Sequence, residues 1–126
     1  MENFSYALWD MVFNSECDPC LIVYMMAPIS ETTAEIGLWN LESYSIEYCH
    51  PSDISPIPLE ISHRYIQIGG DARWQTIREI KYIHQAQQLS RSLWGEEIKL
   101  NYDNYTAHRQ LIAEHLVETI ESRNQN

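Results

Sequence analysis

The chain has 126 residues, with 44% hydrophobic and 21% charged residues, which fits one globular domain over residues 1–126 and argues against intrinsic disorder. Its formal net charge is −10, and residues 1–63 carry ten acidic residues without any Lys or Arg. This charge repels polyanions, so the sequence predicts no binding to nucleic acid or to a membrane surface.

The first predicted element is a short helix over residues 5–14. Ser5 can cap its start. Four apolar side chains recur at helical spacing on one side of the segment: Leu8, Trp9, Val12 and Phe13. We therefore expect the domain to begin with a helix.

Four strands are predicted next. Residues 20–26 are apolar on both faces, as in a central strand that is covered on both sides. Residues 35–41 and 44–49 follow, and the second of these shows the period-2 pattern of a half-buried strand. Three prolines within residues 50–59 predict an extended connector without regular pairing. Residues 61–68 predict the last strand.

Two helices are predicted to complete the chain. The first begins at the cap residue Asp71, and its apolar residues recur every three or four positions until Gly95 ends it. The second spans about residues 104–121, and residues 122–126 are expected to fray. This order predicts an α+β fold: a short N-terminal helix, a mainly antiparallel four-stranded sheet, and two C-terminal helices packed on one face.

Aromatic residues near the two C-terminal helices suggest a binding surface. The chain contains four Trp and eight Tyr but only two Phe, and Tyr and Trp are enriched at recognition surfaces. We predict that a partner polypeptide binds in a groove between these helices, lined by Tyr82, Trp94, Tyr102, Tyr105 and His108. The alternative is that these side chains only close the edge of the core.

A Cys-x-x-Cys motif is formed by Cys17 and Cys20. It resembles the redox motif of the thioredoxin family. The resemblance implies a stabilised thiolate at a helix start and a cis-proline facing the motif, for which Pro56 or Pro58 is suitably placed. Thiol redox chemistry is therefore an alternative function, and the other interpretation is two ordinary thiols where a loop meets a strand.

Two further patterns bear on chemistry. His108 and His115 lie seven residues apart on one helical face, so a small enzyme with a His/carboxylate site is another alternative. No metal site is predicted, because Cys17 and Cys20 lack a second pair of ligands at zinc spacing. Residues 69–71 are not followed by the motif of a nucleotide-binding loop, so no cofactor is predicted.

The sequence thus predicts a non-enzymatic protein–protein interaction module. We expect a small acidic accessory, assembly or adaptor factor that binds a basic or amphipathic segment or tail of a larger partner. A homodimer is expected, because twofold symmetry is the default for small accessory proteins. Three cysteines, no N-terminal leader and no apolar run longer than residues 20–27 predict a cytoplasmic protein without a membrane span.

Overall fold

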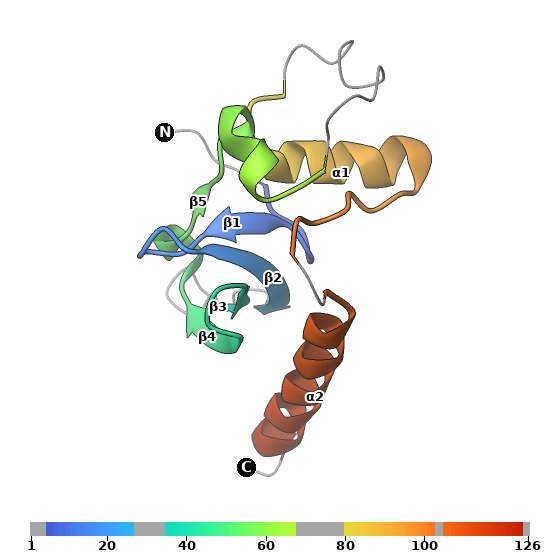
Figure 1. The fold of residues 1–126 in the computed structure, drawn as a ribbon. Helices are drawn as coiled ribbons and strands as arrows, with labels where there is room; N and C mark the ends of the chain where they lie inside the picture. The colour runs from blue at the N-terminus through green and yellow to red at the C-terminus, as the bar shows by residue number, and fades with distance from the viewer. Residues whose placement is uncertain (1–4, 27–34, 68–79, 103–104, 125–126) are drawn as a thin grey trace.

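The computed structural model describes residues 5–26, 35–67, 80–102 and 105–124. The fold is α+β, as predicted, and it is built on one antiparallel sheet (Figure 1). The sheet has five strands rather than four, in the order β4-β3-β2-β1-β5. The strands are β1 (Met11–Phe13), β2 (Pro19–Met26), β3 (Glu35–Asn40), β4 (Ser45–Cys49) and β5 (Ser55–Pro56).

The two faces of the sheet carry separate hydrophobic clusters, as the alternation of side chains along strands requires. The larger cluster, called here the helix-covered cluster, consists of Met11, Leu21, Val23, Trp39, Leu41, Ile57, Ile66, Ile83, Leu100 and Ile112. The cluster on the opposite face consists of Val12, Cys20, Ile22, Ile36 and Leu38. Strand β2 contributes to both clusters, which confirms a central strand that is buried on both sides over residues 20–23, whereas Met25 near its end is exposed.

The predicted N-terminal helix is wrong. Residues 5–10 contain a turn and no helix, and the chain then enters β1, which pairs with β2 on one side and β5 on the other. A helix of ten residues gains little from its own hydrogen bonds, so long-range strand pairing decides the structure of this segment. The turn before β1 places Trp9 at a φ of 72°, in the left-handed region.

The segment between β4 and the helices also differs from its prediction. Ser55 and Pro56 pair with β1 as a two-residue edge strand, where a proline is tolerated because one side of an edge needs no donor. The predicted strand over residues 61–68 is wrong: Leu59–Arg64 forms the 3₁₀ helix η2. Ile66 then pairs with Leu100 in an isolated bridge. A shorter 3₁₀ helix, η1 (Pro51–Asp53), precedes β5.

Helix α1 spans Ile83–Trp94 and ends where the sequence predicts. Gly95 adopts a left-handed conformation (φ 63°, ψ 24°), and its N–H donates to the Arg91 carbonyl oxygen at 3.0 Å. The predicted start at Asp71 lies outside the described residues. A continuous helix from residue 71 to residue 94 is nevertheless wrong, because Tyr82 is extended and pairs with Pro58 in an isolated bridge.

Helix α2 spans Tyr105–Asn124, so it includes three residues of the segment expected to fray. Its orientation differs from that of α1, and Figure 1 shows the two helices beside different parts of the sheet. Helix α1 packs on β1, whereas α2 reaches β3 through a hydrogen bond from Trp39. The expectation that the two helices lie side by side is therefore wrong, although both contribute a residue to the helix-covered cluster.

Candidate functional site

The five residues predicted to line one groove are dispersed. Tyr82 directly precedes α1 and Trp94 ends it, so about 18 Å of helix separates them at 1.5 Å per residue. Tyr102 packs half-buried against the helix-covered cluster, and His108 is fully buried beneath α2. Tyr105 begins α2, and its side chain lies outside the described part. The four described side chains therefore lie in different surroundings.

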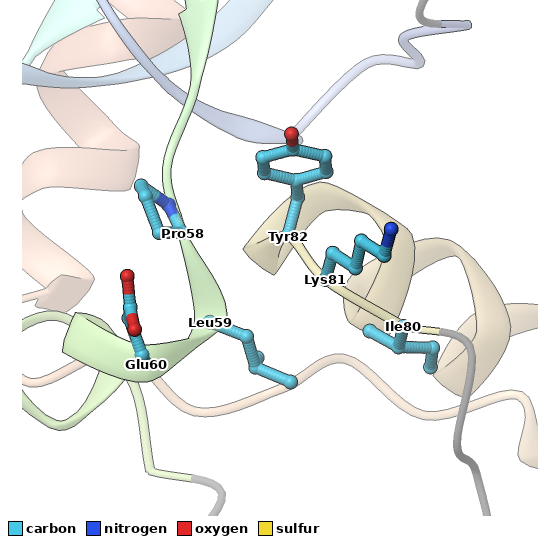
Figure 2. Close-up of a pocket in the computed structure, with 6 residues that line it drawn as sticks. All are labelled: Pro58, Leu59, Glu60, Ile80, Lys81 and Tyr82. Atoms are coloured by element: carbon cyan, nitrogen blue, oxygen red, sulfur yellow. The ribbon is translucent and has the colours of Figure 1, made fainter.

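Tyr82 instead borders a broad cavity at the start of α1 (Figure 2). The cavity has a volume of about 570 Å³ and is lined by Pro58, Leu59, Glu60, Ile80, Lys81 and Tyr82. Its two walls are joined by a hydrogen bond from the Leu59 N–H to the Lys81 carbonyl oxygen at 2.8 Å. With a single carboxylate and a single ammonium group, the lining does not define one class of ligand.

The two cysteines of the Cys-x-x-Cys motif lie in different environments. Cys17 is exposed in the turn between β1 and β2, whereas Cys20 is buried on β2. No helix begins at either residue, and both thiols are free. Burial, and then Glu47, raises the pKa of the Cys20 thiol. The described peptide bonds, which include those of Pro56 and Pro58, are all trans. This geometry differs from the arrangement that the thioredoxin resemblance implies.

The two histidines proposed for acid/base chemistry also lie apart. His108 is buried, and its Nδ1 accepts a hydrogen bond from Trp39 Nε1 at 3.0 Å. His115 lies at the helix surface, with its Nδ1 4.0 Å from a carboxylate oxygen of Glu118. Within the described residues, no carboxylate is hydrogen-bonded to His108, and the carboxylate near His115 lies on the exposed surface of α2.

Acidic side chains from three separate segments meet in a small pocket. Glu16 comes from the turn between β1 and β2, Glu47 from β4 and Asp53 from η1. The pocket, called here the acidic pocket, has a volume of about 200 Å³. Its lining residues are Asn14, Ser15, Glu16, Glu47, Tyr48, Cys49 and Asp53. Neither Lys nor Arg is among them.

Asn14 holds two walls of the acidic pocket together. Its side chain is almost fully buried, and its Oδ1 accepts hydrogen bonds from the backbone N–H groups of Glu16 and Asp18, both at 2.9 Å. Its Nδ2 donates to Glu47 Oε1 at 2.5 Å. One amide group therefore fixes the turn between β1 and β2 and orients a carboxylate on β4.

The thiols beside the acidic pocket stay protonated at neutral pH. Burial, followed by Asp53 and Glu47, raises the pKa of Cys49 to about 11. The Cys20 thiol donates to the Asp18 carbonyl oxygen at 3.5 Å and lies 3.8 Å from Glu47 Oε1. The charge of this region is therefore carried by its carboxylates rather than by thiolates.

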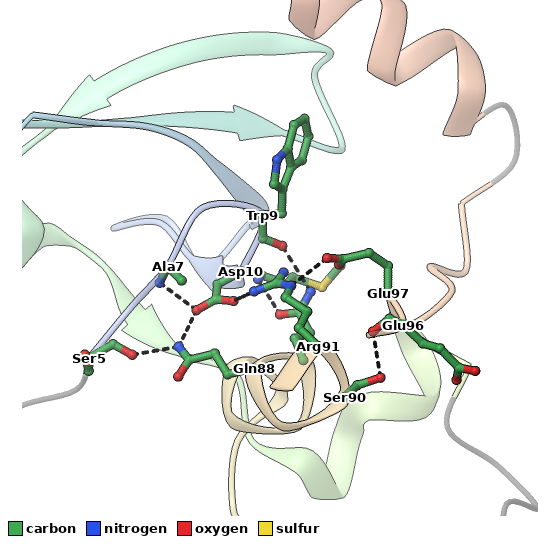
Figure 3. A network of polar contacts seen from close by, with 11 residues as sticks. Ser5, Ala7, Trp9, Asp10, Gln88, Ser90, Arg91, Glu96 and Glu97 are labelled. Carbon is green, nitrogen blue, oxygen red and sulfur yellow. Dashed lines mark hydrogen bonds and ion pairs between the residues drawn. The ribbon is translucent and has the colours of Figure 1, made fainter. Parts of the chain in front are cut away.

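A second polar cluster links the N-terminal segment to α1 (Figure 3). Asp10 is fully buried and accepts three hydrogen bonds: from the Ala7 N–H at 2.8 Å, from Gln88 Nε2 at 2.6 Å and from Arg91 Nη1 at 2.7 Å. Arg91 also donates to Glu97, whose side chain is largely exposed. Because each Asp10 oxygen has a protein partner, this cluster attaches α1 to the segment before β1.

The sequence analysis missed both polar clusters. The shortage of Lys and Arg in residues 1–63 indicated an acidic surface, but it could not show which carboxylates share a pocket. That depends on β4 lying beyond β3 and on the path of the chain from η1 to β5. The burial of Asp10 could not be predicted from the sequence, because Asp10 is an ordinary polar position in the helix that was expected over residues 5–14.

Comparisons with known proteins assign no family: no family model, no curated protein and no solved structure matches the chain. Neither α1 nor α2 contains an apolar stretch long enough to cross a bilayer. In the ranges that the structure describes, no group of three or more His, Cys, Asp or Glu side chains is arranged to hold a metal ion.

Proposed function

We propose that the protein is a non-enzymatic interaction module that binds a basic segment of a larger partner at the acidic pocket. One observation carries this proposal: three carboxylates from three segments line a pocket that contains no Lys or Arg. A Lys or Arg side chain from a partner supplies the missing positive charge. The proposed contact lies at the end of the sheet near β4 and not between the two helices, where the sequence predicted it.

The volume and the lining residues of the acidic pocket fit one basic side chain. A volume of about 200 Å³ accommodates a long side chain and a few waters, and Tyr48, which is 37% exposed, offers an aromatic surface for the aliphatic stem. Two charges 4 Å apart attract by about 1 kcal/mol in bulk water and by about 4 kcal/mol near a protein surface. Three carboxylates around one cation therefore favour binding and speed up encounter.

The neighbouring sheet edge adds a second contact. Strand β4 ends the sheet order among the described residues, and it carries Glu47 in its centre. Extended peptides add to exposed sheet edges through backbone hydrogen bonds, while their alternate side chains enter pockets. A partner segment with basic residues at alternate positions matches both features.

The experiment uses a fluorescent ten-residue peptide of alternating Lys and Thr, with a Glu-Thr peptide as its charge-reversed counterpart. We expect the Lys peptide to bind and to weaken as salt rises, because the contact is electrostatic. The double substitution Glu16→Gln, Asp53→Asn should weaken binding about tenfold, since each surface pair contributes roughly 0.5–1 kcal/mol. Fluorescence anisotropy at low and high ionic strength measures both effects.

The matched control is Glu114→Gln, which removes a carboxylate from the exposed surface of α2 instead. It should change the affinity less than twofold. Equal losses in the control and in the double variant would reduce the effect to overall charge and contradict a specific pocket. An affinity that does not change with salt would contradict the electrostatic contact itself.

A further inference from the structure

The contact between α2 and the sheet depends on one buried imidazole. His108 is 0% exposed, and Trp39 on β3 donates its indole N–H to His108 Nδ1 at 3.0 Å. Tyr44, from the turn between β3 and β4, stacks on the same ring with centroids 4.2 Å apart and planes 10° apart. A ring nitrogen that accepts a hydrogen bond carries no proton, so the neutral ring holds its proton on Nε2.

Protonation of His108 is incompatible with this contact. The added proton must sit on Nδ1, where it faces the indole N–H of Trp39, and two donors then oppose each other. Nε2 is buried and has no hydrogen-bond partner among the described residues, so the other side of the ring offers the imidazolium no acceptor there. A buried charge without an acceptor is strongly disfavoured. Burial accordingly lowers the pKa of His108.

The surroundings of His108 supply no compensating negative charge. Among the described side chains, the titratable and charged groups on the elements around it are Glu35 on β3, Glu42 and Tyr44 in the β3–β4 turn, Tyr102 before α2, and Arg109, Glu114, His115 and Glu118 on α2. Burial raises the pKa of Tyr102, which keeps that phenol neutral. Glu42 is exposed, and Glu118 lies 4.0 Å from His115. Burial lowers the pKa of His108, and no carboxylate among the described residues opposes this shift.

Few other side chains hold α2 in place. In the described part of the helix, Ile112 is the other buried residue, and Leu116 is partly buried one turn further on. Arg109 lies over the Trp9 ring, with its guanidinium carbon 5.5 Å from the ring centroid. Two sets of contacts contain no residue of α2. They are the hydrophobic cluster on the opposite face of the sheet and the Asp10 cluster at α1.

We propose that α2 is a proton-sensitive latch: neutral His108 holds the helix on the sheet, and protonation of His108 releases it while the sheet and α1 stay folded. Release uncovers Trp39 and Ile112, which are both buried in the closed state. The device therefore converts a fall in pH into the exposure of an apolar surface on the sheet.

The pH window follows from the sign of the shift. A free imidazole has a pKa of about 6.5, and the folded-state pKa of His108 is lower. The stabilising effect of neutral His108 is therefore fully present above about pH 6.5. It is lost as the pH falls from there towards the folded-state pKa, because the released state takes up the proton first.

Hydrogen exchange of the intact chain at pH 7.5 and pH 5.5, corrected for intrinsic exchange rates, tests the proposal directly. We expect the opening equilibrium of α2 to increase about tenfold at pH 5.5, the limit set by protonation of a free imidazole with a pKa of about 6.5. Protection of β2 and α1 should change much less. Equal loss of protection in α2 and β2 would show global unfolding and overturn the latch, as would unchanged protection in α2.

Two substitutions isolate His108. In His108→Asn the amide oxygen can replace Nδ1 as the acceptor for Trp39 but cannot be protonated, so the acid response of α2 should disappear. His115→Asn removes an imidazole from the surface of the same helix, 5.7 Å from the Trp39 ring, and should preserve the response. An acid response that survives in His108→Asn would assign it to another group. If this variant fails to fold, the exchange data on the unmodified chain still decide.

The substitution Trp39→Phe tests the hydrogen bond through the pKa of His108, which a purely packing role of Trp39 would not change. Without the indole N–H, His108 Nδ1 becomes free to accept a proton, so the pKa of His108 should rise towards 6.5. NMR titration of the imidazole protons measures this pKa in both proteins. A pKa that stays the same after the substitution would show that the indole hydrogen bond does not control protonation.

Discussion

The contacts that fasten α1 and α2 to the sheet are built on opposite principles. At α1, buried Asp10 is charged and accepts from the Arg91 guanidinium and from two further donors, although Arg91 Nη2 has no hydrogen-bond partner among the described residues. At α2, buried His108 carries no charge, makes one hydrogen bond and leaves Nε2 without a partner. The first contact fails when a partner is removed, whereas the second fails when a proton is added.

This difference separates permanent from conditional attachment. A buried ion pair is costly to break, because its surviving member is left as an uncompensated charge. A neutral imidazole is maintained only while the pH keeps it neutral. His84 on α1 sharpens the contrast: burial lowers its pKa, but Asp10 acts in the opposite direction, whereas His108 has no such carboxylate.

The largest expected effect is the loss of the ion pair at α1. Asp10→Ala leaves Arg91 Nη1 and the Ala7 N–H without their acceptor, while Gln88 Nε2 keeps only the Ser5 carbonyl oxygen, and it should lower the free energy of unfolding by about 3–5 kcal/mol. Urea denaturation followed by circular dichroism measures the change. The paired control is Glu97→Gln, which removes the other carboxylate bound to Arg91.

Glu97 has a side chain that is 61% exposed, so this control should cost less than about 1 kcal/mol. Similar losses for the two variants would mean that burial of Asp10 contributes little to the contact. The proposed difference between the two helices would then disappear.

A smaller effect is expected from weakening the apolar part of the α2 contact. Ile112 is 1% exposed, and Ile112→Ala should cost about 2–4 kcal/mol in the attachment of α2. Leu111 is 37% exposed on the same helix, so Leu111→Ala should cost under about 1 kcal/mol. Hydrogen exchange should show the Ile112→Ala loss concentrated in α2. A loss spread evenly over α1 and β2 would argue against independent release of α2.

The smallest effect concerns the end of α1. At Gly95 the φ is 63°, and a Cβ added there would meet no atom within 4 Å, so Gly95→Ala tests backbone conformation alone. It should cost about 1 kcal/mol in the free energy of unfolding, measured by thermal or urea denaturation. A neutral substitution would show that the last turn of α1 contributes little to its attachment.

The sequence predicted the elements whose signals are local. The apolar run of β2, the strand β4 and the glycine that ends α1 each depend on neighbouring residues, and each is present. The burial of β4 does not alternate as predicted, because Tyr48 is exposed while Glu47 is half-buried. His108 and His115 were expected on one face of the last helix, and both imidazole rings lie beside the Trp39 ring of β3, with ring centroids 6.0 and 5.7 Å away.

The errors occur where distant partners decide the structure. Helical spacing in residues 5–14 was overridden by pairing with β2 and β5, and residues 61–68 formed η2 and a bridge to Leu100. The acidic pocket joins residues 14–16, 47–49 and 53 through sheet order, which no local pattern encodes. Whether Nε2 of His108 has a hydrogen-bond partner likewise depends on the side chains that surround the ring in the folded chain.

The side chain of Gln87 has a consequence for self-association. Its Oε1 accepts from the Met11 N–H at 2.7 Å, and its Nε2 donates to the Trp9 carbonyl oxygen at 3.1 Å, as the peptide group of an adjacent strand would. Strand β5 pairs with β1 only at Val12 and Phe13, so this amide occupies the edge of β1 that β5 does not reach. An uncovered edge is a template for aggregation. A single glutamine from a helix thus occupies the backbone groups at the edge of β1 that β5 leaves unpaired.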